Sequence, residues 1–268
     1  YFATNNRSVK TLFQFGDQNI KASTVLCEWG RQYCCLAGYD GGSNNVIWLT
    51  YKTYDSLNES IIKSIVDEVS STGSVVVGSA FSESILTPLN YNGEEALQQL
   101  YSPAQPVIAL FDTINEWQVK NYYLIPKAIH TAFNDKFSNV SYINFFTAAL
   151  KNNNGYGSSD QIAVHFSPNQ FSVLVKKSGQ LQLAQTYSYQ APLDVIYYLL
   201  KMVEEFNLSK EEVALVISGL IDEKSDLYRE IYQYFLNVHF SETLGLKGNH
   251  TYPSHFFTSI FNLTTCVS

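Results

Sequence analysis

The sequence predicts an α/β protein made of two lobes that share one order of elements: three strands, a helix, a strand, a helix and a strand. Two observations predict this class. In the second half of the chain, segments in which apolar and polar residues alternate, as in strands, precede segments with the apolar spacing of helices and strands. The first half has the same succession. The chain also has 268 residues, which is near the size at which one hydrophobic core divides into two.

The second lobe is expected over residues 160–268. Leu181 and Leu183 alternate with glutamines, as in a strand with one buried face, whereas the apolar run "VALVIS" is typical of a strand buried on both faces. After Pro192, a residue favoured at the first position of a helix, apolar residues recur at helical spacing. The expected elements are strands Gln161–Phe166, Gln170–Lys176 and Gln180–Tyr189, a helix from Pro192, strand Val213–Ser218, helix Lys224–Leu236 and strand Asn237–Phe240.

The first lobe is expected over residues 1–150. Ser56 and Glu59 form a capping-box pattern ahead of an apolar helical stripe. The expected elements are strands Ser23–Trp29, Gln32–Gly38 and Asn45–Lys52, a helix after Ser56, strand Ser74–Ala80, strand Asn121–Ile125, a helix begun by Pro126, strand Val140–Asn144 and a short helix. An excursion with three prolines, Phe81 to about Lys120, interrupts this order. The Asn- and Gly-rich stretch Asn152–Ser159 is expected to connect the lobes.

Composition excludes several classes of protein. The net charge of −7 argues against a nucleic-acid partner, whose binders are basic. No apolar run approaches the roughly 20 residues of a transmembrane helix. The four cysteines, Cys27, Cys34, Cys35 and Cys266, have neither CxxC spacing nor a histidine at zinc-ligand spacing, so we expect no metal site. We expect buried thiols, Cys34 and Cys35 facing opposite sides of their strand, in a reducing, cytoplasmic compartment.

Four segments carry a resemblance to a known family: "FSESILTPLNY" (Phe81–Tyr91), "YYLIPKAIHTAFNDKF" (Tyr122–Phe137), "LQLAQTYSYQAPLDVIYYLL" (Leu181–Leu200) and "LVISGLID" (Leu215–Asp222). On these, the chain resembles a bacterial family of uncharacterised proteins in the actin-like ATPase superfamily. Its layout is similar to that of the pilus-assembly scaffold PilM. The resemblance implies a duplicated ribonuclease-H-like fold with two lobes around a cleft and a small subdomain, about residues 81–120, inserted in the first lobe. It also implies that a partner peptide lies in a groove edged by this insertion.

The resemblance directs attention to the hairpins that hold phosphates and metal in ATP-using members of the superfamily. Those hairpins need an acid and a glycine, because glycine lets backbone N–H groups approach phosphate and a carboxylate holds Mg²⁺. In "CEWGRQY", Glu28 and Gly30 keep the acid-x-glycine spacing. The alternative for these two is an ordinary hairpin with an acid and a turn glycine.

The second lobe keeps less of this pattern. "HFSPNQF" has no acid and no glycine; His165 stands near the place of the aspartate, and Pro168 removes a backbone donor. Ser167 can shape the turn. At the adenosine position, "VISGLIDE" keeps Ser218 and Gly219 but has leucine where a second small residue is needed. The alternatives are a structural histidine and a helix-entry turn with Asp222 as the N-cap.

Two functions are carried forward. The first is a non-catalytic scaffold or adaptor, a pseudo-ATPase with degenerate phosphate loops, that binds an unidentified protein partner, with a homodimer left open. The second is a nucleotide-binding protein or slow ATPase that holds Mg-ATP in the inter-lobe cleft, with Glu28, Gly30, Ser167, Ser218 and Gly219 as the cleft-lining candidates. No residue is predicted to be catalytic.

Overall fold

The computed structural model describes residues 9–71, 73–152, 159–242 and 251–267. Within these residues the chain forms two compact units. Of the described residues, unit 1 comprises those up to Lys151 and those from Ile260 onward. Unit 2 comprises Asn152, residues 159–242 and Thr251–Ser259. None of the helices in the described segments is long and apolar enough to cross a membrane.

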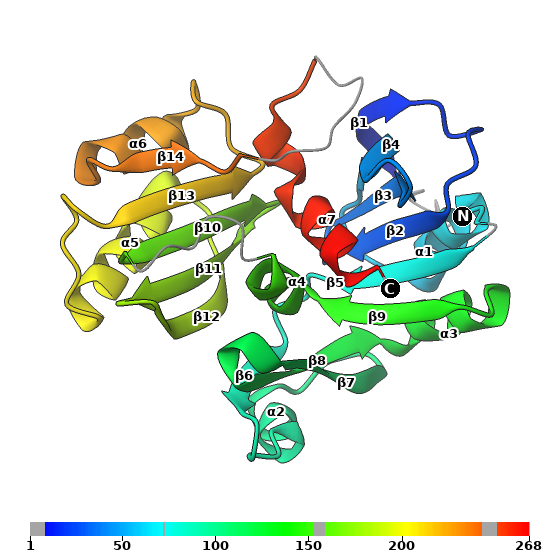
Figure 1. Cartoon of the computed structure of the whole chain (residues 1–268), viewed down its shortest axis with the longest axis horizontal. Helices are drawn as coiled ribbons and strands as arrows, with labels where there is room; N and C mark the ends of the chain where they lie inside the picture. The colour runs from blue at the N-terminus through cyan, green and yellow to red at the C-terminus, as the bar shows by residue number, and fades with distance from the viewer. Residues whose placement is uncertain (1–8, 72, 153–158, 243–250, 268) are drawn as a thin grey trace, which may run out of the picture. The chain divides into compact units, whose positions relative to one another are not determined.

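Unit 1 is built on a six-stranded sheet in the order β1-β4-β3-β2-β5-β9 (Figure 1). Its strands are β1 (Lys10–Gly16), β2 (Thr24–Trp29), β3 (Tyr33–Asp40), β4 (Asn45–Thr53), β5 (Ser74–Ser79) and β9 (Val140–Asn144). β2 pairs in parallel with β5 and β5 with β9, whereas the other pairs are antiparallel. β2 and β5 are buried on both faces, as their continuous apolar runs predict. The edge strand β1 was not predicted.

Two helices, α1 (Glu59–Glu68) and α3 (Lys127–Lys136), cover one face of this sheet. α1 buries Ile61 and Ile65, and α3 buries Ile129 and Phe133, in one core with the strand residues. The predicted capping box is wrong. Asn58 is the N-cap, and its side chain accepts a hydrogen bond from the Ile61 N–H at 3.0 Å. Glu59 is therefore the first helical residue rather than the third, and Ser56 lies outside the helix.

The excursion forms a small three-stranded antiparallel sheet in the order β6-β8-β7, with one short helix. Its elements are β6 (Ser84–Pro88), α2 (Glu94–Leu100), β7 (Val107–Ile114), a 3₁₀ turn (Asn115–Trp117) and β8 (Val119–Pro126). The predicted strand Asn121–Ile125 thus pairs inside this sheet and not with the large one. Leu97, Tyr122 and Leu124 form its own core.

A buried polar network joins the small sheet to the large one. The Asn121 side-chain amide donates to the Asn144 side chain at 2.8 Å and to the Thr147 hydroxyl at 3.0 Å. Asn144 ends β9, and Thr147 lies on the following helix α4 (Phe145–Lys151). Asp112 of β7 accepts from the Asn144 backbone N–H at 2.9 Å. These bonds fix the small sheet against the carboxyl end of β9.

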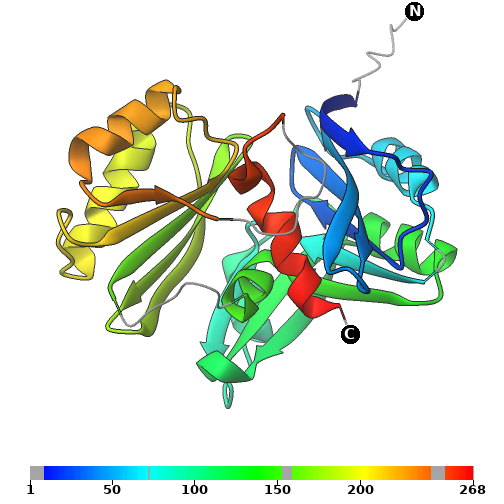
Figure 2. The ribbon, with the colours of Figure 1, turned by 45° about the horizontal axis from the view of Figure 1, so that its top comes forward.

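Unit 2 is a five-stranded sheet, β12-β11-β10-β13-β14, with α5 and α6 packed on one face (Figure 2). Its elements are β10 (Gln161–Ser167), β11 (Gln170–Lys177), β12 (Gln180–Ser188), α5 (Pro192–Glu205), β13 (Ala214–Gly219), α6 (Asp226–Tyr234) and β14 (Val238–Phe240). The predicted order β-β-β-α-β-α-β is confirmed, with boundaries shifted by one or two residues. The predicted N-cap Asp222 is wrong, because the Ser225 side chain accepts from the Tyr228 N–H and begins α6.

The last described residues form a continuous helical segment: the 3₁₀ turn Ser254–Phe257, α7 (Thr258–Asn262) and the 3₁₀ turn Leu263–Cys266. Its first turn packs on β13 in unit 2, and its last turn packs on β5 and α4 in unit 1. In unit 1, Leu263 lies so close to Gly78 that a Cβ on Gly78 would be 2.7 Å from Cδ1 of the leucine. The glycine in β5 therefore makes room for this segment.

Candidate functional site

Glu28 and Gly30 lie at the hairpin that joins β2 to β3 in unit 1. Glu28 is buried, and its carboxylate accepts a hydrogen bond from the Tyr33 hydroxyl at 2.9 Å. Burial and the neighbouring Glu28 raise the pKa of Tyr33, which keeps this hydroxyl protonated at neutral pH. A Cβ on Gly30 would lie 2.6 Å from Cδ1 of the Tyr33 ring. The ring occupies the space that the glycine leaves, so packing alone explains why residue 30 has no side chain.

Ser167 ends β10 and begins the turn to β11 in unit 2. Its hydroxyl donates to the Gln170 carbonyl at 3.3 Å, and Asn169 has a left-handed φ of +58°. The Asn169 carbonyl accepts from the Tyr189 N–H at 3.1 Å. Serine and asparagine are the residues that stabilise such local reversals. The hydrogen bonds of Ser167 and Asn169 in this turn therefore stabilise the reversal of the chain between β10 and β11.

Ser218 and His165 are neighbours across β13 and β10, and both are buried. The Ser218 hydroxyl donates to the Val164 carbonyl at 3.3 Å and lies 3.0 Å from Nδ1 of His165, which leaves Nδ1 as the donor to the serine. Burial, and then the nearby His255, lower the pKa of His165 to about 3. The imidazole is therefore neutral and holds the two strands together.

Gly219 follows Ser218 in a left-handed conformation with φ of +80°. A Cβ on this residue would overlap the Phe166 carbonyl oxygen and lie 2.7 Å from the Phe166 nitrogen. The Leu220 N–H donates to the same carbonyl at 2.8 Å. Glycine is required here by the close approach of the turn to β10.

His255 covers this turn from the 3₁₀ turn Ser254–Phe257. Its Nε2 lies 2.8 Å from the Ile221 carbonyl oxygen, and its ring stacks on Phe240 with centroids 4.1 Å apart. The stretch after β13 is thus contacted within unit 2 by the His255 side chain.

The five predicted site residues form two groups. Glu28 and Gly30 belong to unit 1, and Ser167, Ser218 and Gly219 belong to unit 2, at the adjacent ends of β10 and β13. Across the described residues, no three His, Cys, Asp or Glu side chains gather as they would around a metal ion.

The predicted cysteine environments are confirmed for three of the four. Cys27, Cys34 and Cys35 are buried free thiols, and Cys266 is half-buried. Cys34 belongs to the core under α1 and α3, whereas Cys35 lies near Glu28 on the other face of the sheet. Burial raises the pKa of Cys27, Cys34 and Cys35, so the reactive thiolate form is suppressed.

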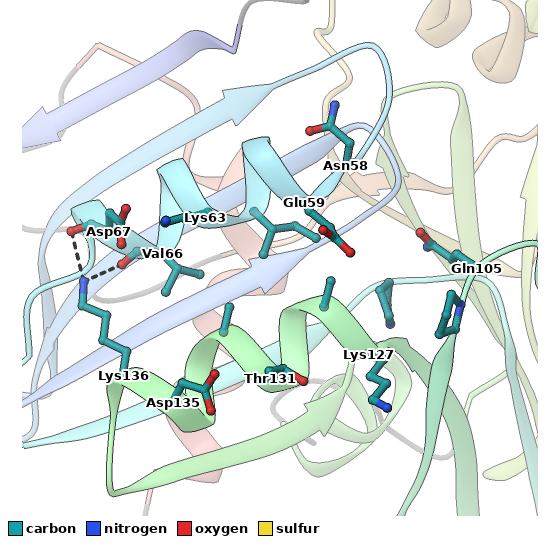
Figure 3. A pocket seen from close by; sticks show the side chains of 15 residues that line it. Asn58, Glu59, Lys63, Val66, Asp67, Gln105, Lys127, Thr131, Asp135 and Lys136 are labelled. Atoms are coloured by element: carbon teal, nitrogen blue, oxygen red, sulfur yellow. Dashed lines mark hydrogen bonds between the residues drawn. The ribbon is translucent and has the colours of Figure 1, made fainter.

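A groove of about 870 Å³ lies between α1 and α3 in unit 1 (Figure 3). Gln105 and Pro106, from the loop before β7 of the small sheet, border one end of it. The volume is in the range of pockets that hold small ligands or short peptide segments. None of the five predicted site residues lines this groove.

The groove exists because α3 presents small side chains to α1. Ile129 and Phe133 of α3 are directed into the core, whereas Ala128 and Ala132, also four residues apart, line the groove. An alanine side chain ends at Cβ, so the gap between the two helices is not filled. The facing residues on α1 include Ile62 and Val66, and the floor is therefore apolar.

Charged residues form the rims. Those of α1 are Glu59, Lys63 and Asp67, and those of α3 are Lys127 and Asp135, with Thr131 between them. On each helix they recur every four residues and so lie on one face. In the described parts of the chain, none of these five charges makes an ion pair. Both helices begin at the Gln105 end of the groove (Figure 3).

Lys136 ties the two walls together at the other end. Its Nζ donates to the carbonyl oxygens of Val66, Asp67 and Val69, at 2.7, 3.0 and 2.8 Å. These are carbonyls at the C-terminal end of α1, which has no basic residue in its own last turn. Lysine from α3 therefore supplies the cation that a helix C-terminus favours, and it fixes the spacing of the helices there.

Residues 14–238 match the model of one protein family, "Protein of unknown function (DUF3822)". The chain belongs to this family. The match covers most of both units, including the insertion and the α1–α3 groove. A search of curated proteins finds no match.

Solved structures identify the fold of the chain. A protein from Bacteroides thetaiotaomicron VPI-5482, with an actin-like ATPase fold and unknown function, has a TM-score of 0.77 at 19% identity and covers 93% of this chain and 98% of its own. A chain of the PilM–PilN type IV pilus biogenesis complex has a TM-score of 0.62 at 10% identity, with 91% and 98% covered. This DUF3822 chain has the actin-like ATPase fold, as predicted. Identities this low bear on the fold alone.

One sequence pattern of this DUF3822 chain is consistent with the groove. In "KAIHTAFNDK", the pair Ala128 and Ala132 runs beside the core pair Ile129 and Phe133. Small residues at helical spacing next to a core stripe indicate that the flank of the stripe is shallow. The pattern does not reveal which helix faces that flank.

Proposed function

We propose that this chain is a scaffold or adaptor that binds a segment of a protein partner in the groove between α1 and α3. The observation that carries the proposal is the groove itself, with an apolar floor, charged rims and one end bordered by the insertion. Such a surface suits a peptide that is apolar on one side and polar on the other. A neighbour of the fold occurs in a complex with a protein, PilN, which is in keeping with this use of the fold.

The contacts of the predicted nucleotide residues support a role without catalysis. Gly30 is accounted for by the Tyr33 ring, and Gly219 by the backbone of Phe166. His255 covers the turn that would approach adenosine. The two glycines thus have structural reasons for their identity, which favours a pseudo-ATPase over the alternative of nucleotide binding or slow ATP hydrolysis.

Partner capture with a groove-filling variant tests the proposal. Ala132→Leu places three more carbon atoms in the groove, whereas Ala109→Leu makes the same change at an exposed position of β7 outside it. Both proteins serve as bait in lysate of the source cells, with bound proteins quantified by mass spectrometry. A partner retained by the wild type and Ala109→Leu, and lost by Ala132→Leu, is expected. A partner that Ala132→Leu retains, or none with any bait, contradicts the proposal.

A second copy of the chain is included among the partners that this proposal allows. Light scattering of the wild type and Ala132→Leu over a range of concentrations tests for a homodimer that depends on the groove. We also assign the scaffold to the cytoplasm, because three buried free thiols suit a reducing compartment. Thiol labelling of the protein denatured directly from cells measures that redox state.

A further inference from the structure

We propose that the segment bound in the α1–α3 groove is dipolar, with a basic residue beside Asp67 and Asp135 and an acidic residue beside Lys127. The inference rests on the proposed function and adds the charge and the direction of the bound segment. It follows from the unequal ends of the groove.

The end near Lys136 is negative. Asp67 and Asp135 are exposed, lie one on each helix and border the groove there (Figure 3). Each stands in the last turn of its helix, where the helix dipole adds partial negative charge. The cation at this end, Lys136, already donates to three carbonyls of α1. Lys63 lies one turn before Asp67, but in the described part of the chain neither carboxylate makes an ion pair, so both remain available to a basic side chain of a partner.

The end near Gln105 is positive on the α3 side. α3 begins after Pro126 with no side-chain cap and no acidic residue in its first turn, and Lys127 is its first residue. The Lys127 N–H donates to the Pro106 carbonyl at 2.9 Å, and the helix dipole together with the Lys127 ammonium makes this end positive. On the opposite wall, Asn58 caps α1 and Glu59 lies in its first turn, so that helix end is already compensated. An acidic group of the partner is favoured beside Lys127.

The spacing of the two ends sets the spacing of the partner's charges. Lys127 and Asp135 are eight residues apart on one helix, which corresponds to about 12 Å along its axis. Side chains about four residues apart in an extended segment, or about eight apart in a helical one, span that distance. The partner residues between the acid and the base would face Ile62, Val66, Ala128 and Ala132 of the groove floor, so we expect them to be apolar.

Selection of random linear peptides displayed on phage, with the whole chain immobilised, tests the inference without a known partner. Selections use the wild type, Asp135→Lys, Ala132→Leu and the control Glu116→Lys, which reverses an exposed acid outside the groove. Selected peptides are then synthesised, and their affinities are measured. We expect an acid and a base at one of the two spacings, about tenfold weaker binding to Asp135→Lys, and unchanged binding to Glu116→Lys.

The outcomes separate the two proposals. Peptides that lose affinity for Ala132→Leu but show no paired charges, or that bind Asp135→Lys as well as the wild type, overturn the dipolar segment and leave the groove as a binding site. If no selected peptide is sensitive to Ala132→Leu, both proposals fail. Peptides that carry the charges in the predicted spacing and lose affinity for both groove variants support both.

Discussion

The turn after β13 brings Gly219 against the backbone of Phe166, so closely that a Cβ on the glycine would overlap the Phe166 carbonyl oxygen. We predict that Gly219→Ala lowers the free energy of unfolding of unit 2 by about 2–4 kcal/mol, because the alanine adds this clash to a left-handed backbone. Urea unfolding, monitored by far-UV circular dichroism, measures the loss.

Gly179 is the matched control for this change. It has almost the same φ, +76°, but a Cβ there would meet nothing within 4 Å. Gly179→Ala should therefore cost only the backbone conformation, about 1 kcal/mol. Equal losses for the two variants would show that the contact with Phe166 does not determine the glycine at 219.

A second prediction concerns nucleotide. We expect millimolar Mg-ATP to leave the melting temperature unchanged, because the glycines of both predicted loops are accounted for by packing. A site with a dissociation constant tenfold below the ligand concentration would stabilise the chain by about 1.4 kcal/mol, a rise of about 2–4 °C. Differential scanning fluorimetry with Mg²⁺ alone as the control detects it. A rise that the isosteric change Glu28→Gln removes would favour the nucleotide-binding alternative.

The order of elements could be predicted from the sequence because each element has a strong local signal. The apolar runs of β5 and β13 and the stripes of α1 and α5 were recognisable without tertiary information. Edge strand β1 alternates weakly and is mostly exposed, so its pattern carried little signal. The caps at Asn58 and Ser225 were missed because Ser56 and Asp222 are equally good cap residues, and only the folded chain selects between them.

The candidate site could not be predicted because it depends on which helices become neighbours. Ala128 and Ala132 are ordinary helix residues in the sequence, and they form a groove only where α3 lies beside α1. Lys136 likewise reaches carbonyls about 70 residues away along the chain, from Val66 to Val69. The predicted residues Glu28 and Gly219 came instead from the superfamily pattern. That pattern identifies sequence positions, but it does not show which side chains or backbone atoms pack against them.

Lys136 gives a third prediction. Lys136→Met keeps the aliphatic stem but removes three charge-assisted hydrogen bonds to the C-terminal end of α1, so we expect a loss of about 2 kcal/mol in the free energy of unfolding. Lys136→Arg should lose less, because it retains the charge. Lys201→Met, at an exposed position of α5, is the control and should change stability by less than about 0.5 kcal/mol. Chemical denaturation compares the three. Similar losses for Lys136→Met and Lys201→Met would remove the proposed link between the helices.

The fourth prediction is a loss of stability in mild acid that originates at His165. Burial, and then His255, lower the pKa of His165 from its ordinary 6.5 to about 3, and burial also lowers that of His255. Between these values the unfolded chain binds protons that the native chain does not, so stability is complete above pH 6.5 and falls as the pH falls below it. At pH 5 the neutral His165 should cost about 2 kcal/mol relative to pH 7.

The variant His165→Asn separates this effect from that of other groups, including His255. Asparagine retains a polar group near the Ser218 hydroxyl but cannot take up a proton in this range. The free energy of unfolding of the variant, measured in urea at steps between pH 7 and pH 5, should therefore fall less steeply than that of the wild type. Parallel curves would show that His165 is protonated to the same degree in the folded and unfolded chains, in conflict with an imidazole held neutral between β10 and β13.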